Sequence, residues 1–251
     1  MKKAILLITA MTMAIGCKET KKETGNEVPM ATTENTAETA TENEWEILFS
    51  GDSFDGWHEY RKEGVSEHWK LEDGAMVFHP PKERPEGTSY NLVTDTEYTN
   101  FVLSLEWRIA EGGNSGVMYG VRELPELGQP YETGPEIQVL DNAGHPDGKN
   151  GTSHQAGALY DMVSPSKDVT KPIGEWNSME ITIDRNANEG KVVLNGEKVV
   201  EFPVNDPEWS AMVANSKFAE WEYFAKYDKG KIALQDHGDG VAFRNIKIKE
   251  L

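Results

Sequence analysis

Apolar and polar residues alternate in short runs from Trp45 onward, and Gly, Asp, Asn and Pro separate the runs. The clearest run is 101–109, in which every odd position is large and apolar and the even positions include Glu106 and Arg108. A period of two residues indicates a β-strand with one face in a core and the other face open. The same reasoning predicts further strands at 69–71, 75–78, 116–121, 136–140, 177–184, 191–194, 198–202, 232–235 and 241–249.

Turn sequences and one exceptional segment complete the expected fold. Asp73-Gly74 and Asn195-Gly196 each join two strands, and Asn-Gly is a strong signal for a type I′ hairpin turn. Asp206-Pro207 followed by Glu208 is typical of a helix start, so we expect a short helix from about 207 to 217. A dozen short strands at this spacing predict an all-β fold, a sandwich or jelly roll of two antiparallel sheets with one short inserted helix.

The chain begins with a predicted export signal. Lys2 and Lys3 precede an apolar run that ends at Gly16-Cys17 and is too short to span a bilayer. Residues 14–17 resemble the bacterial lipobox, which predicts a lipoprotein signal peptide over 1–16 and lipid attachment at Cys17, the only cysteine. The alternative is an ordinary signal peptide with an incidental cysteine, although a free thiol is disfavoured outside the cell. We therefore expect an exported, lipid-anchored protein at the outer membrane or its periplasmic face.

Composition separates a tether from a domain. Residues 17–44 contain almost no large apolar side chain, so they cannot offset the entropy of ordering and are expected to form a disordered tether. One folded domain is expected over 45–251. The chain has 25 Lys and Arg against 43 Asp and Glu, a net charge of −18, which repels phosphate backbones. We expect no nucleic-acid partner.

The densest group of polar residues lies in 132–161. On the strand predicted there, Ile137 and Val139 would face a core, while Glu136 and Gln138 would face outward. Such a strand followed by a polar loop can form a ligand site, but it can equally be a solvated face.

A second polar face strengthens this interpretation if it is close to the first. Glu106 and Arg108 share the outward face of 101–109, and in the same sheet as Glu136 and Gln138 they would create one polar surface. The alternative is a solvated face with ordinary cross-strand charge pairs.

The remaining candidates are loop residues. Asn114-Ser115-Gly116 suits a tight loop that approaches a ligand, or simply a turn between strands. His145, four residues after Asp141, and His237, at the end of a strand, could each act as a general base near neutral pH. The other histidines are interpreted as structural or surface residues: His58, His68, His79 and His154.

Several kinds of chemistry have no support in the sequence. No Gly-x-Ser-x-Gly, phosphate-loop or dinucleotide motif is present. No residues have the spacing of a structural zinc site, and no metal ligand is assigned, although a divalent ion held by scattered carboxylates and a histidine stays open. Seven Trp and eight Tyr suit a carbohydrate ligand, whose C–H faces stack on aromatic rings, although Trp107 is expected in the core.

A series of motifs runs through essentially all of 45–251. They are Phe54-Asp55-Gly56-Trp57, residues 105–109 (LEWRI), 113–116 (GNSG), 131–142 (YETGPEIQVLDN), His145, 156–161 (AGALYD), 174–177 (GEWN), 194–196 (LNG), 232–238 (IALQDHG) and 243–246 (FRNI). In these motifs and their order the chain resembles the bacterial family of 3-keto-disaccharide hydrolases, formerly a domain of unknown function. One departure is Val192-Val193, where many members have a polar or aromatic pair, and this puts one wall of the site in doubt.

The resemblance implies a concanavalin-like jelly roll that binds its ligand on the concave sheet. It also implies a substrate, a glycoside whose C3 hydroxyl has been oxidised to a ketone by a partner sugar 3-dehydrogenase. A C3 ketone acidifies the C2 proton, so a modest base can start β-elimination of the group at C1, and water added to the enone completes a hydrolysis. Direct hydrolysis is the other possibility. Such an enzyme needs a base, a group that stabilises the enolate and an acid for the leaving oxygen.

Residue roles are assigned on this basis. His145 or Glu136 is expected as the base, and Arg108 or a bound divalent ion is expected to stabilise the enolate. The residues expected to bind the sugar are Glu106, Asn114, Gln138, Asp141, Tyr160, Gln235 and His237.

Two other functions fit the same fold. The first is a non-catalytic, lectin-like carbohydrate-binding lipoprotein, and the second is a surface adhesion or scaffold protein, because fold alone does not fix function. A titratable group with a perturbed pKa at the centre of the site would favour the enzyme, since a lectin needs no activated base.

Overall fold

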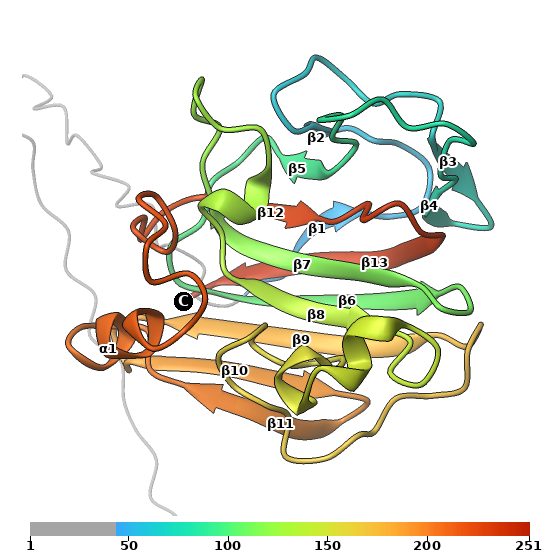
Figure 1. The fold of residues 1–251 in the computed structure, drawn as a ribbon. Coiled ribbons are helices and arrows are strands. Elements are labelled where there is room, and N and C mark those ends of the chain that lie inside the picture. The colour runs from blue at the N-terminus through green and yellow to red at the C-terminus, as the bar shows by residue number, and fades with distance from the viewer. Residues whose placement is uncertain (1–43) are drawn as a thin grey trace, which may run out of the picture. The chain divides into compact units, whose positions relative to one another are not determined.

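The computed structural model describes residues 44–251, so the predicted signal peptide, Cys17 and residues 18–43 of the predicted tether lie outside the described residues. The described chain forms two antiparallel β-sheets, as the sequence predicted (Figure 1). Within residues 44–251, no helix is long and apolar enough to cross a membrane.

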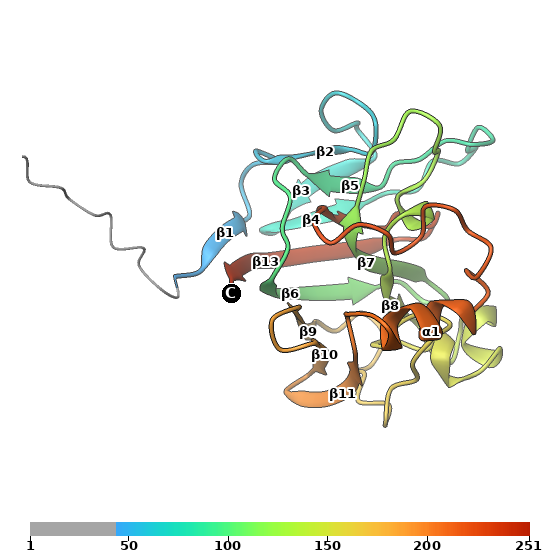
Figure 2. The same cartoon turned by 90° about the vertical axis from the view of Figure 1, so that its left-hand side faces the viewer.

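The larger sheet has eight strands. The long strands β6 (Phe101–Ile109) and β13 (Val241–Glu250) lie side by side in its middle, paired from Phe101–Glu250 to Ile109–Val241 (Figure 2). The order across the sheet is β11 (Glu197–Phe202), β10 (Glu189–Leu194), β9 (Asn177–Asp184), β6, β13, β4 (Ala75–Phe78) and β3 (Trp69–Glu72), with β1 (Glu46–Phe49) paired to β13.

The smaller sheet has five strands and carries the polar strand singled out above. Its order is β2 (Trp57–Glu59), β5 (Leu92–Thr94), β12 (Lys231–Leu234), β7 (Asn114–Val121) and β8 (Glu136–Leu140). β8 is an edge strand. The short 3-10 helix Pro130–Glu132 precedes it in the chain, and the 3-10 helices Pro146–Lys149 and Thr152–His154 follow it.

The core lies between the two sheets, and residue parity decides which side chains enter it. The odd residues of β6 are at most 3% exposed, whereas its even residues are partly exposed. In β8, Ile137 and Val139 are fully buried in the same core, so Glu136 and Gln138 face outward as predicted. Burial of these large side chains is the main source of stability for such a sandwich.

The predicted turns and helix are present. Asp73-Gly74 joins β3 to β4 and Asn195-Gly196 joins β10 to β11, and both residues of each turn have the positive φ that a type I′ turn requires. Helix α1 (Glu208–Ala214) lies within the predicted range. The Asp206 carboxylate accepts a hydrogen bond from the Ser210 amide, which satisfies one of the free N–H groups of its first turn.

Two expectations about local arrangement are wrong. Asn114-Ser115-Gly116 is not a loop but the first part of β7, where it pairs with residues 138–140 of β8. Glu106 and Arg108 do not share a sheet with Glu136 and Gln138, because β6 belongs to the eight-stranded sheet and β8 to the five-stranded sheet. Their outward faces therefore point away from each other, with the core between them.

Candidate active site

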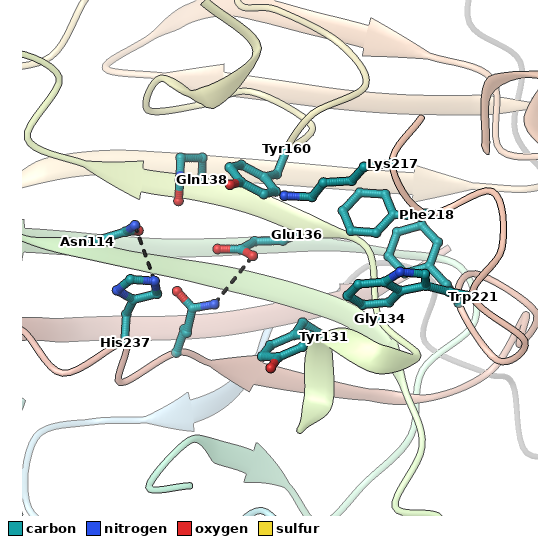
Figure 3. Close-up of a pocket in the computed structure, with 12 residues that line it drawn as sticks. Asn114, Tyr131, Gly134, Glu136, Gln138, Tyr160, Lys217, Phe218, Trp221 and His237 are labelled. Carbon is teal, nitrogen blue, oxygen red and sulfur yellow. Dashed lines mark hydrogen bonds between the residues drawn. The ribbon is translucent and has the colours of Figure 1, made fainter. Parts of the chain in front are cut away.

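A pocket of about 370 Å³ lies over the outward face of β7 and β8. Figure 3 shows Glu136 in its middle, with Asn114 and His237 toward one end and Phe218 and Trp221 at the other. The residues that line it are Asn114, Tyr131, Gly134, Glu136, Gln138, Tyr160, Lys217, Phe218, Trp221, Phe224, Gln235 and His237.

Six of the residues predicted from the sequence are brought together here. Glu136 and Gln138 come from β8, and Asn114 from the neighbouring β7. Gln235 and His237 follow β12 on the other side of β7, and Tyr160 comes from the loop after β8. Three adjacent strands and one loop therefore supply the polar side chains of the pocket.

Glu136 is the only carboxylate that lines this pocket within residues 44–251. Burial raises its pKa to about 8, although the charge of Lys217 and a hydrogen bond from Gln235 favour the carboxylate and Asp147 opposes it. The Gln235 side-chain amide donates that bond to Glu136 Oε2 over 3.4 Å. A carboxyl group with this pKa can accept a proton near neutral pH, which an ordinary surface carboxylate does poorly.

The polar end of the pocket offers hydrogen-bonding groups that the protein leaves unused. Oδ1 of Asn114 and Oε1 of Gln235 are buried and have no hydrogen-bond partner among the described residues. Nδ2 of Asn114 lies 3.5 Å from Nε2 of His237. Unpaired buried acceptors are costly, so these two oxygens suit the hydroxyl groups of a ligand or ordered water.

Aromatic rings form the opposite end. Phe218 stacks on Phe224 with 4.0 Å between ring centroids, and Trp221 packs edge-on against Phe218 at 5.1 Å. The ring centroid of Tyr131 lies 6.0 Å from that of Trp221. Tyr131 is 38% exposed, so the aromatic end of the pocket is open to solvent. Such a surface suits the C–H face of a sugar or another apolar group.

Two hydrogen bonds hold the chain segment after α1 to the loops on either side of β8. The Ala225 amide donates to the Thr133 carbonyl over 2.8 Å. The Lys217 amide donates to the side-chain Oδ2 of Asp161 over 3.0 Å. These bonds hold the segment beside β8, a strand that lies far away in the sequence.

Tyr160 belongs to a hydrogen-bond network beside the pocket. Its hydroxyl donates to Asp147 Oδ2 over 2.9 Å, and burial together with this bond raises the pKa of Tyr160. His154 lies between two carboxylates, with Nδ1 2.9 Å from Asp147 and Nε2 3.2 Å from Asp161. The Tyr160 proton is thus held by Asp147, which suits Tyr160 for orienting a ligand rather than for accepting a proton.

His145 does not line the pocket but lies next to His237, with 5.9 Å between the ring centroids. Its Nδ1 accepts a hydrogen bond from the Asp147 amide over 3.1 Å. In the neutral ring the proton is therefore on Nε2, so His145 is placed to donate a hydrogen bond rather than to act as a base. Of the two predicted bases, only Glu136 lies in the pocket.

His237 and Asp239 form a cluster with His145 in which one potential ligand atom of each lies within 4.8 Å of the others. Two imidazoles and a carboxylate are donors that suit a divalent transition-metal ion. Two of these groups already accept hydrogen bonds from backbone amides. His145 Nδ1 accepts from Asp147 and Asp239 Oδ2 accepts from Asn114, each over 3.1 Å. Burial lowers the pKa of His237, and His145 adds to the effect while Asp239 opposes it.

Asp141, predicted to bind the sugar, supports the loop after β8 instead of lining the pocket. Its carboxylate accepts hydrogen bonds from the amides of Gly112, Ala143 and Gly144, at 2.8 to 3.2 Å. Burial alone would raise its pKa, but these hydrogen bonds outweigh burial and lower it.

Arg108 and Glu106 lie on the other sheet and do not reach the pocket. The Arg108 guanidinium packs 4.8 Å from the ring centroid of Trp176. Oε2 of Glu106 accepts hydrogen bonds of 2.7 Å from Arg244 and from Asn245, at an irregularity in the pairing of β13 with β6. The prediction that these two residues join the site is wrong, because strand parity fixes a face of a sheet but not which sheet the strand enters.

Sequence reasoning missed the aromatic end and its lysine. Phe218, Trp221 and Phe224 lie in the segment after α1, for which no strand or helix was predicted, and Lys217 was expected at the end of the helix without a role in the site. A signal was present, since residues 218–224 (FAEWEYF) contain four aromatic residues without the alternation of a core strand. Tyr131 was quoted within a motif but given no role.

Comparison with known proteins identifies the family to which this chain belongs. A model of the family described as "3-keto-alpha-glucoside-1,2-lyase-like domain" matches residues 44–249. A protein of Bacteroides thetaiotaomicron named 3-keto-disaccharide hydrolase is 35% identical over 228 residues, which cover 81% of this chain and 77% of the relative.

Solved structures agree with the fold. A crystal structure described as that of a candidate glycosyl hydrolase from Parabacteroides distasonis has a TM-score of 0.76 and 32% identity, covering 82% of this chain and 94% of that chain. A second structure from the same organism, described in the same way, has a TM-score of 0.62 and 29% identity, covering 83% and 100%. These relatives support a glycoside-cleaving enzyme with a jelly-roll fold. This chain belongs to the family of 3-keto-α-glucoside-1,2-lyase-like domains.

Proposed function

We propose that this protein cleaves 3-keto-glycosides, 3-keto-disaccharides among them, by elimination followed by hydration. The family description and the name of the Bacteroides relative support the substrate class. The observation that carries the mechanism is Glu136, a single carboxyl group in the middle of the pocket whose pKa burial raises to about 8.

The reaction begins with proton transfer from C2 to the Glu136 carboxylate. The electrons of the C2–H bond form an enolate with the C3 ketone. When the ketone re-forms, a double bond appears between C1 and C2, and the bond from C1 to the leaving oxygen breaks, with that oxygen taking up a proton. Water then adds its oxygen to C1 and a proton to C2, so the net reaction is hydrolysis.

The number of carboxylates supports this route. An ordinary glycosidase places two carboxyl groups on either side of the bond that is cleaved. Among residues 44–251, Glu136 is the only acidic residue that lines the pocket. A reaction that starts with one base at C2 needs no second carboxylate at a fixed separation.

The two ends of the pocket suit the two parts of the substrate. The keto sugar would lie at the polar end, where Asn114, Gln138 and Gln235 can bond its hydroxyl groups. The leaving group or second sugar would lie on the rings of Phe218 and Trp221.

Further parts of the proposal concern the setting of the enzyme. A sugar 3-dehydrogenase would supply the keto substrate, and export with lipid attachment at Cys17 would hold the enzyme at the outer membrane or its periplasmic face. The cluster of His145, His237 and Asp239 could hold a divalent ion beside the polar end, where it would help to orient the keto sugar.

The test is to incubate the full chain with 3-keto-trehalose and with trehalose, with and without a chelator, and to measure glucose release. We expect release from the keto sugar alone, and a drop of about 10²–10⁴-fold in Glu136→Gln, which keeps the shape of the side chain but cannot take a proton. Loss of activity with the chelator, and its recovery when a divalent ion is added back, would show that the reaction requires a bound divalent ion. Binding of keto sugars without release would support the lectin-like function instead.

A further inference from the structure

The pocket contains a positive charge that the proposed mechanism has not yet used. An enolate carries its charge mainly on the oxygen of the former ketone, so a cation near that oxygen would lower the barrier to proton removal. Sequence reasoning gave this role to Arg108, which lies on the other sheet. Within residues 44–251, Lys217 is the only lysine or arginine that lines the pocket.

The ammonium group of Lys217 is available for a ligand. It lies 4.0 Å from the ring centroid of Tyr160 and 5.2 Å from that of Phe218. In the part of the chain that the structure describes, it lies within 4.0 Å of no carboxylate oxygen and so forms no ion pair. Figure 3 shows the side chain extending toward the ring of Tyr160.

The backbone and the wall beside Lys217 are held in place by hydrogen bonds. Asp161 accepts the Lys217 amide through Oδ2 and contacts His154 through Oδ1, at 3.0 and 3.2 Å. His154 contacts Asp147, which accepts the Tyr160 hydroxyl, at 2.9 Å in each case. The chain of contacts therefore starts at the backbone of Lys217 and ends at the ring on which its ammonium group rests. A charge that is positioned before the reaction begins stabilises a transition state without reorganisation.

Lys217 and Glu136 line the same pocket, as the proposed substrate requires. The ketone oxygen is bonded to the carbon next to C2, so the cation that stabilises the enolate must lie close to the base that takes the C2 proton. Lys217 acts electrostatically on the Glu136 carboxyl group, where its charge favours the ionised form.

We propose that Lys217 is a catalytic residue whose ammonium group stabilises the enolate oxygen formed when Glu136 removes the C2 proton. This inference rests on the proposed function. In the first step the C2–H bond breaks, the proton moves to Glu136, and the electron pair moves to the C3 oxygen beside Lys217. When the leaving group departs, the pair returns and the ammonium group remains charged, so no other reactant is needed.

Proton exchange separates this step from departure of the leaving group. A 3-keto-1,5-anhydroglucitol has no exocyclic leaving group at C1, so exchange of its C2 proton in D2O with the full chain reports proton removal without departure of an aglycone, and NMR detects it. Exchange at C4, which is also next to the ketone, is an internal reference. Release of glucose from 3-keto-trehalose is measured in parallel.

Lys217→Met removes the charge and keeps most of the side-chain length, while Lys217→Arg keeps the charge. Lys198→Met is the matched control, because Lys198 is on β11 in an exposed ion pair with Glu201. We expect Lys217→Met to slow both C2 exchange and kcat by about 10²–10³-fold with a much smaller change in KM. Lys217→Arg should be at least about tenfold faster than Lys217→Met in both measurements. Lys198→Met should have the same rates as the wild type.

The pH profile gives a second readout that a purely structural role would not change. Without the neighbouring charge, the ionised form of Glu136 is less favoured, so the rising limb of the rate profile should move to higher pH in Lys217→Met. C2 exchange within about threefold of wild type in a folded Lys217→Met protein would overturn the role of Lys217 and leave the proposed function intact. A wild type that neither exchanges C2 nor releases glucose would overturn both.

Discussion

Gly116 lies directly against the side chain of Glu136, so closely that a Cβ atom at position 116 would be 1.9 Å from Glu136 Oε1. The two residues are diagonal neighbours on paired strands, because Gly116 pairs with Gln138 and Met118 pairs with Glu136. The φ of Gly116 is not in the left-handed region, so glycine is needed here for space rather than for backbone conformation. The carboxyl group of Glu136 thus occupies the place where any other residue would put its side chain.

The first prediction follows from this contact. Gly116→Ala should push the Glu136 carboxylate out of its position and reduce kcat by about 10²-fold or more, since misplacement of a catalytic group by about 1 Å has effects of that size. Steady-state rates with 3-keto-trehalose measure this effect, and circular dichroism checks the fold.

Gly128→Ala is the control, because the nearest atom to a Cβ at that position is a side-chain oxygen of Glu132 at 3.8 Å. It should leave kcat unchanged. Equal losses of activity in the two variants would show that the effect comes from general damage rather than from displacement of Glu136.

The second prediction concerns the dependence of the rate on pH. With a pKa of about 8, Glu136 is mostly protonated at pH 7, and only its ionised form can remove the C2 proton. The rate of C2 exchange should therefore increase about tenfold from pH 7 to pH 9 and then level off. An exchange rate that is already constant above pH 5.5 would mean that a group with an ordinary carboxylate pKa, or none at all, limits the reaction.

The third prediction concerns stability, and its sign follows from proton binding. Between the ordinary carboxyl value of 4.5 and about 8, the folded protein holds the Glu136 proton more tightly than the unfolded chain. Glu136 should therefore lower the free energy of unfolding as the pH rises through this range, and the loss should be complete above about pH 8.

Glu136→Gln cannot titrate, and its amide oxygen can still accept the hydrogen bond from Gln235. Compared with wild type, it should be more stable at pH 9 by about 1–3 kcal/mol, with a smaller difference at pH 5. Urea unfolding at the two pH values measures this difference. A gain of the same size at both would show that ionisation of Glu136 is not its cause.

The fourth prediction concerns Arg108, which was expected from the sequence to stabilise the enolate. Arg108→Ala should keep kcat/KM within about twofold of wild type, because Arg108 lies on the outward face of the eight-stranded sheet. The loss of its contact with Trp176 should cost about 0.5–1 kcal/mol of stability. Thermal unfolding and the sugar-release assay measure the two effects. A large fall in kcat/KM at unchanged stability would contradict the placement of the site.

Much of the site could be predicted from the chain because local pattern determines which way a strand residue points. The alternation in 135–140 placed Glu136 and Gln138 opposite Ile137 and Val139, and the structure confirms this. The motifs also pointed to Asn114, Tyr160, Gln235 and His237, which all line the pocket. The roles assigned to these residues remain predictions.

The errors share one physical cause. Glu106 and Arg108 have the same alternating pattern as Glu136 and Gln138, and nothing in either pattern says which strands will pair. Asn114 was placed in a loop because Gly, Asn and Ser favour turns, yet pairing with β8 draws 114–116 into a strand. In both cases contacts between segments distant in the sequence decided the outcome.

The class of fold, the hairpins, the inward and outward faces of the strands and the family could all be predicted from the chain, because each of these depends on neighbouring residues or on motifs read along the chain. The tertiary arrangement was needed to tell which polar face carries the pocket. It also brings Lys217 into the pocket that contains Glu136 and leaves His145 outside the lining. Strands β9, β10 and β11 and helix α1 separate Glu136 from Lys217 in the sequence, and only packing of the segment after α1 over the five-stranded sheet brings both side chains into one pocket.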